Sequence, residues 1–179
     1  AMKIFSVNEK GFIKILDAIL KRGESDTAGI EDAVKAILQD VKRNGDRSLL
    51  KYTERFDGTM FARMQDTRCR MQDIDRAFKS IPNSDLKILK LAAKRIETFH
   101  KRQLHKSWAF AEEDGTVLGQ MVTPLERVGI YVPGGKAVYP STVLMNAIPA
   151  RVAGVKEVVM VTPPSKNGIN PYVLAAAEI

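Results

Sequence analysis

The chain has 179 residues, of which 45% are hydrophobic, 27% charged and 7% aromatic. This composition is typical of a soluble globular protein and excludes disordered, collagen-like and disulfide-scaffold classes. No apolar run approaches the ~18–20 residues that span a bilayer, and the N-terminus lacks the apolar segment of a signal peptide. Because Cys69 is the single cysteine, no internal disulfide can form. We therefore expect a cytoplasmic protein without a membrane partner.

Charge is distributed unevenly along the chain. Residues 1–107 carry 23 basic and 15 acidic side chains, whereas residues 108–179 carry 5 and 6. This asymmetry predicts two lobes of different character. The expected organisation is a helical lobe over 5–107, a hairpin connector over 108–124 and an α/β lobe over 125–179.

In the first lobe, apolar residues at helical spacing predict helices near 12–20, 30–43, 46–57 and 72–80, with Gly23 as the stop of the first. A longer helix follows Pro82, and its cap is expected at Asn83, Ser84 or Asp85. One face of this long helix is expected to carry Leu89, Ala92, Ile96 and Phe99, and another Lys87, Lys90, Lys94 and Lys101. The basic face has two interpretations, a phosphate-binding surface for nucleic acid or a solvated helix face. The lysines lack interleaved aromatic residues, so the solvated face is favoured and no nucleic-acid partner is expected.

Histidine and cysteine do not assemble a metal site in this sequence. His100 and His105 are five residues apart, whereas zinc-binding pairs on one helix are three or four apart. Both are interpreted as surface or boundary residues. Arg68 and Arg70 flank Cys69 and predict a lowered thiol pKa, but no base lies nearby in sequence. We expect no catalytic residue and no metal ligand among these positions.

A β-hairpin is predicted where Trp108 and Phe110 alternate with alanines before Asp114-Gly115, a strong two-residue turn signal. That turn places Trp108 opposite Met121 and Phe110 opposite Gly119, and such cross-strand pairs stabilise a sheet. We interpret the hairpin as structural.

The second lobe follows a strand–helix–strand–helix order, which predicts two parallel strands. The strands are expected at 128–132 and 157–162. The first helix begins at Pro140 and stops at Gly154, and Pro149 should kink it or end it early. Asn170 is the expected cap of the second helix.

Ligands of open α/β sheets bind beyond the carboxyl ends of the strands, where Tyr131 and the Pro133-Gly134-Gly135 turn are expected. The glycines allow close backbone approach, and Lys136 and the next helix N-terminus favour an anion such as a nucleotide diphosphate. A tight turn that needs glycine for geometry alone is an equally open interpretation. The P-loop and the G-x-G-x-x-G fingerprint are both absent.

The stretch RVGIYVPGGKAVYPSTVLMNAIPARVAGVKEVVMVTPP, residues 127–164, resembles the N-terminal signature region of the histidinol dehydrogenases. The stretch VKAILQDVKRNGDRSLLKYTERFDG, residues 34–58, is similar to the helical region of the same family. The resemblance implies an α/β fold with a partial Rossmann-like βαβα unit of the aldehyde-dehydrogenase-like type. It also implies oxidation of L-histidinol to L-histidine through the aldehyde with two NAD, a bound zinc ion and a homodimer.

In this resemblance Tyr131 matches an NAD-contacting tyrosine, and Pro133, Gly134 and Gly135 form the adjoining turn. The family's zinc ligands and its Glu-His acid/base pair lie further along than residue 179. We therefore expect an N-terminal fragment that is inactive alone. The alternatives are a truncated, non-catalytic paralogue that acts as a binding module, and a basic nucleic-acid-binding helical domain.

Overall fold

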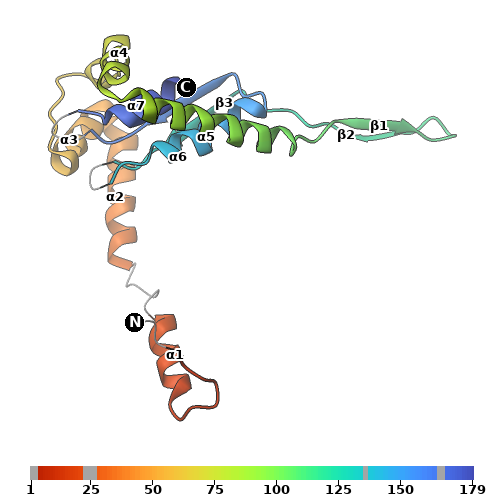
Figure 1. Cartoon of the computed structure of the whole chain (residues 1–179), viewed down its shortest axis with the longest axis horizontal. Coiled ribbons are helices and arrows are strands. Elements are labelled where there is room, and N and C mark those ends of the chain that lie inside the picture. The colour runs from red at the N-terminus through yellow and green to blue at the C-terminus, as the bar shows by residue number, and fades with distance from the viewer. Residues whose placement is uncertain (1–3, 22–27, 135–136, 165–167) are drawn as a thin grey trace. The chain divides into compact units, whose positions relative to one another are not determined.

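The computed structural model describes residues 4–21, 28–134, 137–164 and 168–179. Contacts within the chain group it into two compact units, residues 1–49 and residues 50–179. The first unit holds helix α1 (Phe12–Leu20), helix α2 (Ala28–Asn44) and the start of α3 (Asp46–Asp57) (Figure 1). These bounds confirm the helices expected there, while the predicted stop at Gly23 lies outside the described residues.

The joint between α2 and α3 follows from its local sequence. Gly45 takes a φ of 57°, a left-handed conformation that ends α2 and that glycine adopts without strain. The Asp40 carboxylate accepts hydrogen bonds from Ser48 Oγ at 2.9 Å and from Asn44 Nδ2 at 2.6 Å. Ser48 is buried, so this carboxylate satisfies a hydroxyl that would otherwise be costly to bury.

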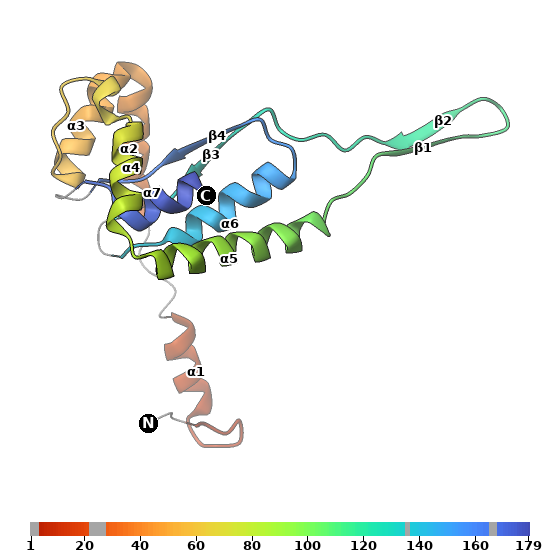
Figure 2. The same cartoon turned by 45° about the horizontal axis from the view of Figure 1, so that its top comes forward.

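The second unit contains both helices and strands, which confirms the expected α/β class. Its elements, in chain order, are a 3-10 turn η2 (Met64–Thr67), α4 (Met71–Ser80), α5 (Asn83–Lys101), β1 (Trp108–Ala111), β2 (Val117–Gln120), β3 (Arg127–Tyr131), α6 (Pro140–Val152), β4 (Glu157–Val161) and α7 (Pro171–Glu178). Helix α5 packs on α6, α6 packs on α7, and α7 packs on α4 (Figure 2).

The start of α5 differs from its expected cap. Pro82, and not Asn83, Ser84 or Asp85, is the N-cap residue, and the cap makes no side-chain hydrogen bond. Proline serves here because its φ of −56° already suits the chain entering a helix. The carboxylate of Asp85 instead accepts a hydrogen bond of 2.6 Å from the hydroxyl of Tyr172 on α7. That hydrogen bond raises the pKa of Tyr172 and ties α5 to α7.

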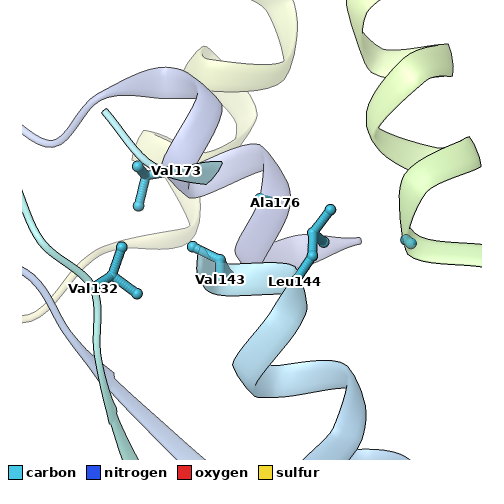
Figure 3. Close-up of a cluster of buried hydrophobic side chains, with 6 residues drawn as sticks. Val132, Val143, Leu144, Val173 and Ala176 are labelled. Carbon is cyan, nitrogen blue, oxygen red and sulfur yellow. The ribbon is translucent and has the colours of Figure 1, made fainter. Parts of the chain in front are cut away.

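The core of the second unit lies where α5, α6, α7 and the end of β3 meet (Figure 3). Its largest fully buried side chains are Leu144, Val132 and Val143. From α5, Ala93 is buried in this core and Leu89, Ala92 and Ile96 pack against it. Phe99, expected on the same face, is 61% exposed. That expectation was wrong. Successive residues of a helix are rotated by 100°, and this rotation places Phe99 at the edge of the apolar stripe, where its side chain points away from the core.

Helix α6 continues past Pro149 to Val152. Of the two effects predicted for this proline, the early end is therefore excluded, and the kink stays a prediction. The last turn closes because the amide of Ala153 donates to the carbonyl of Pro149 at 2.9 Å. Gly154 then stops the helix with a φ of 95°, as predicted. The predicted N-cap of α7 is confirmed, since Asn170 Oδ1 accepts a hydrogen bond from the amide of Tyr172 at 2.9 Å.

The hairpin forms with a register one residue away from the prediction. Trp108 pairs with Gln120 and Phe110 pairs with Leu118, in place of Met121 and Gly119. The loop has three residues, because the amide of Glu112 donates to the carbonyl of Thr116 at 2.8 Å and Gly115 takes a φ of 87°. An Asp114 Oδ1 bond to the Thr116 amide at 2.8 Å holds this loop.

Strands β3 and β4 pair in parallel, as predicted, with Tyr131 opposite Val161. Helix α6 contacts both strands. Burial alternates along each strand, so that one row of side chains is half-buried and the other exposed. The exposed row consists of Arg127, Gly129, Tyr131, Glu157, Val159 and Val161.

Candidate functional site

The candidate site lies at the carboxyl ends of β3 and β4. The ladder extends beyond the strands, because the amide of Val132 donates to the carbonyl of Val161 at 2.9 Å. Two proline-containing segments then leave the sheet together, Pro133-Gly134 after β3 and Pro163-Pro164 after β4. This is the edge at which open parallel sheets bind their ligands.

Tyr131 has a highly exposed side chain at this edge. It is 63% exposed, whereas its neighbour Val132 is completely buried in the core. The alternation of a β-strand causes this contrast, since successive side chains point to opposite faces. Its partner across the ladder, Val161, is also exposed at 58%. The pair offers an aromatic ring and an apolar side chain on one open face, a surface suited to a planar, partly apolar ligand group.

At Gly134 the structure favours the second interpretation, in which glycine is needed for the geometry of the chain. A Cβ atom built at this position would lie 2.8 Å from the carbonyl oxygen of Pro163 and 3.1 Å from its Cγ. The two segments therefore run too close together for any side chain at position 134. Pro133 is half-buried beside it. Gly135 and Lys136 lie outside the described residues, so Tyr131, Pro133 and Gly134 are the expected site residues that the structure brings together at this edge.

The N-terminus of α6 has no side-chain cap, and the amide of Thr142 in its first turn donates to the carbonyl of Tyr139 at 3.0 Å. Tyr139 is its N-cap residue, and Pro140 occupies the first turn. Unsatisfied amides at a helix start carry partial positive charge and suit anions.

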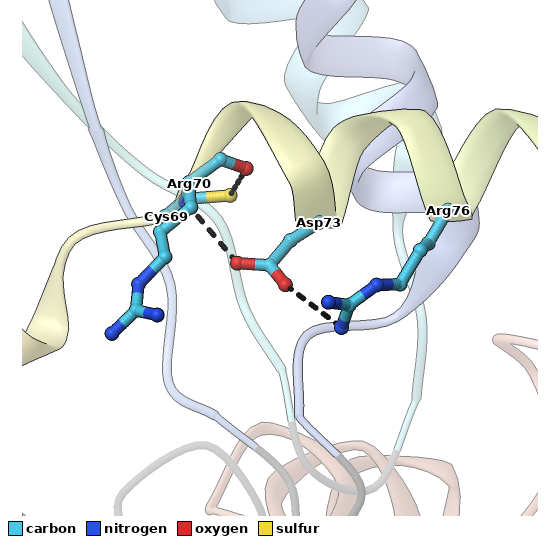
Figure 4. Close-up of polar contacts among 4 residues, drawn as sticks. All are labelled: Cys69, Arg70, Asp73 and Arg76. Carbon is cyan, nitrogen blue, oxygen red and sulfur yellow. Dashed lines mark hydrogen bonds and ion pairs between the residues drawn. The ribbon is translucent and has the colours of Figure 1, made fainter.

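Cys69 differs from its predicted chemistry (Figure 4). Partial burial raises the pKa of the Cys69 thiol, and the carboxylate of Asp73 raises that pKa further. The prediction of a lowered pKa from Arg68 and Arg70 was wrong because the Arg70 guanidinium extends away from the sulfur. The Arg70 amide meanwhile donates to Asp73 Oδ2 at 3.2 Å and holds that carboxylate near the cysteine.

The two histidines are a boundary and a surface residue, as predicted. His100 is half-buried with its Nδ1 atom 2.6 Å from Gln103 Oε1, and His105 is exposed. Within residues 4–21, 28–134, 137–164 and 168–179, no three His, Cys, Asp or Glu side chains gather as a metal site would require. In the same residues, no helix combines the length and hydropathy needed to cross a membrane.

Sequence reasoning missed the apolar partners of Tyr131. Val159 and Val161 come to its face through the parallel register, and both are exposed. The strand alternation in EVVMV contains this information, but only the register of β4 against β3 shows which valine lies beside the tyrosine.

Comparison with known proteins assigns the chain to a family. The family model of histidinol dehydrogenase matches residues 20–179. Curated histidinol dehydrogenases from Syntrophotalea carbinolica and Neisseria gonorrhoeae are 49% and 46% identical over 178 residues, 99% of this chain. The chain covers 41% and 42% of those two proteins, and so spans about two-fifths of the length of these relatives.

A solved structure supports the same relationship. The crystal structure of histidinol dehydrogenase from Elizabethkingia anophelis matches with a TM-score of 0.75 and 32% identity, over 86% of this chain and 34% of that one. The sequence and fold comparisons therefore agree, and the chain belongs to the histidinol dehydrogenase family.

Proposed function

We propose that the chain is the N-terminal part of a histidinol dehydrogenase that oxidises L-histidinol to L-histidine through the aldehyde in histidine biosynthesis. The observation that carries this proposal is the family match over residues 20–179, together with relatives more than twice as long. We further propose that this whole protein acts in the cytoplasm as a homodimer and that neither nucleic acid nor membrane is its partner.

The chain's own contribution is one edge of an NAD site. In this proposal the exposed Tyr131 ring contacts the cofactor, which accepts hydride when bound. Pro133, Gly134 and Gly135 provide backbone close to it. Support comes from the position of Tyr131 at the carboxyl end of a parallel strand, with Val161 beside it. The lobes 5–107, 108–124 and 125–179 would then be a helical lobe, a connector and an NAD-site lobe of partial Rossmann-like, aldehyde-dehydrogenase-like type.

The described residues do not fit a zinc site, because they offer no cluster of three suitable ligands. We therefore propose that the zinc ligands, the general base and the general acid belong to sequence beyond residue 179. Zinc-dependent alcohol oxidation requires such groups around the substrate.

The first test is turnover by the 179-residue chain alone. We expect no NADH from L-histidinol and NAD above the blank, because the described residues hold no metal site and the proposed general acid and base belong to sequence beyond residue 179. The positive control is the longer protein that begins with these residues, which should form two NADH for each histidine. Turnover by the short chain would overturn the proposed division of the site, and failure of the longer protein would overturn the enzyme assignment.

The second test is Tyr131→Ala in the longer protein. We expect the KM for NAD to rise about five- to tenfold, because a lost aromatic contact costs about 1 kcal/mol. The KM for histidinol should change little. Tyr131→Phe is the matched control, since it keeps the ring and should keep the wild-type KM for NAD. Equal NAD saturation in all three proteins would rule out the tyrosine as a cofactor contact.

A further inference from the structure

Helix α5 carries a second stripe of side chains besides the one that packs in the core. The stripe repeats every three to four residues, as one face of a helix does, and lines a groove of about 440 Å³. The lining residues are Leu91, Lys94, Arg95, Thr98, Phe99 and Arg102. Leu91 and Phe99 are 50% and 61% exposed, so the groove has an apolar floor that no described element covers.

The rim of this groove is cationic. Lys94, Arg95 and Arg102 are exposed, and none of them forms a salt bridge within the described part of the chain. The nearby acid Glu97 is already paired, with its Oε1 atom 2.6 Å from the Nζ atom of Lys101. The groove therefore suits an occupant with an apolar body and a negatively charged end.

The hairpin of β1 and β2 has this combination of properties. The Trp108 and Phe110 rings stack with centroids 6.1 Å apart, and Leu118 lies opposite Phe110. All three side chains are about half exposed. The loop that follows carries three consecutive exposed acids, Glu112, Glu113 and Asp114.

The hairpin also needs a partner to be stable. Its strands pair only with each other among the described residues, and every residue of both strands is exposed. An isolated two-stranded hairpin is marginal in water, and clustered exposed apolar side chains mark interaction surfaces.

We propose that the hairpin of one copy of this chain docks in the α5 groove of a second copy, with Trp108 and Phe110 towards Leu91 and Phe99 and the acidic loop at the cationic rim. The lengths are comparable, because residues 108–112, which pair across the hairpin, span roughly 13 Å as a strand and residues 91–102 span roughly 16 Å as a helix. Each copy supplies one hairpin and one groove, so two copies related by a two-fold axis satisfy both surfaces. The proposal rests on the homodimer proposed above and not on the dehydrogenase chemistry.

Sedimentation of the 179-residue chain over a range of concentrations tests the proposal. We expect a monomer–dimer equilibrium that weakens as salt increases, because the contacts are charged and near the surface. Two charge-reversal variants separate the surfaces, a loop variant (Glu112→Lys, Glu113→Lys, Asp114→Lys) and a groove variant (Arg95→Glu, Arg102→Glu). Each alone should weaken dimerisation roughly 100-fold or more, because like charges facing each other cost several kcal/mol.

Mixing the two variants gives the deciding result. In a mixed pair, each basic loop meets an acidic groove and each acidic loop meets a basic groove, so dimers should return. Lys79→Glu with Lys90→Glu is the matched control, since it changes net charge by the same amount as the groove variant at exposed positions outside the groove. Circular dichroism should show unchanged folding in all variants.

Three outcomes would overturn the inference. The first is a chain that stays monomeric at every concentration. The second is a dimer that neither variant weakens, which would place the homodimer interface elsewhere and leave the proposed enzyme intact. The third is a mixture of variants that does not associate, which would indicate that the hairpin folds onto its own chain or onto another partner.

Discussion

Replacing Leu144 with alanine is expected to lower the free energy of unfolding of residues 50–179 by about 2–5 kcal/mol. Leu144 is 2% exposed and lies on α6 beside Val143 and Val132, which are equally buried. Its helix packs against both α5 and α7. The variant would lose the transfer free energy of three buried carbons and leave a cavity that these helices can close only in part.

Chemical denaturation followed by circular dichroism measures this loss, and Met145→Ala is its matched control. Met145 is the next residue of the same helix but is 62% exposed. Its replacement should change the free energy of unfolding by no more than about 0.5 kcal/mol. Similar losses in the two variants would show that α6 does not pack as the structure describes.

Replacing Gly134 with alanine is expected to lower the free energy of unfolding by about 1–3 kcal/mol, the usual range for an overpacked position. The new Cβ would lie 2.8 Å from the carbonyl oxygen of Pro163. Because that oxygen belongs to the backbone, no side-chain rotation relieves the contact, and the segments after β3 and β4 must separate. Since Tyr131 lies only three residues earlier, we also expect weaker NAD binding in the longer protein.

Gly129→Ala is the control for this effect of chain separation. A Cβ at position 129 meets nothing within 4 Å, and its φ is outside the left-handed range. Alanine there should leave the free energy of unfolding within about 0.5 kcal/mol of wild type. If both variants unfold at the same denaturant concentration, the close approach of Gly134 to Pro163 does not constrain the fold.

The sequence determined where the chain is helical or extended. Asn44-Gly45 ends α2, and Asn170 with Pro171 starts α7, in agreement with the prediction. These signals act within one turn of the backbone, because a cap or a glycine stop satisfies or releases local hydrogen bonds. The motif around Tyr131 likewise identified the family from local sequence alone.

Only the tertiary structure decided the properties that depend on contacts between distant residues. The hairpin register depends on whether its loop has two or three residues. The thiol pKa of Cys69 depends on where Asp73 and the Arg70 side chain lie in space. The small size of Gly134 is explained by Pro163, which lies 29 residues further along the chain. Local sequence fixes backbone conformation, but it does not fix which side chains come into contact. Those contacts depend on packing, which results from many weak interactions over the whole unit.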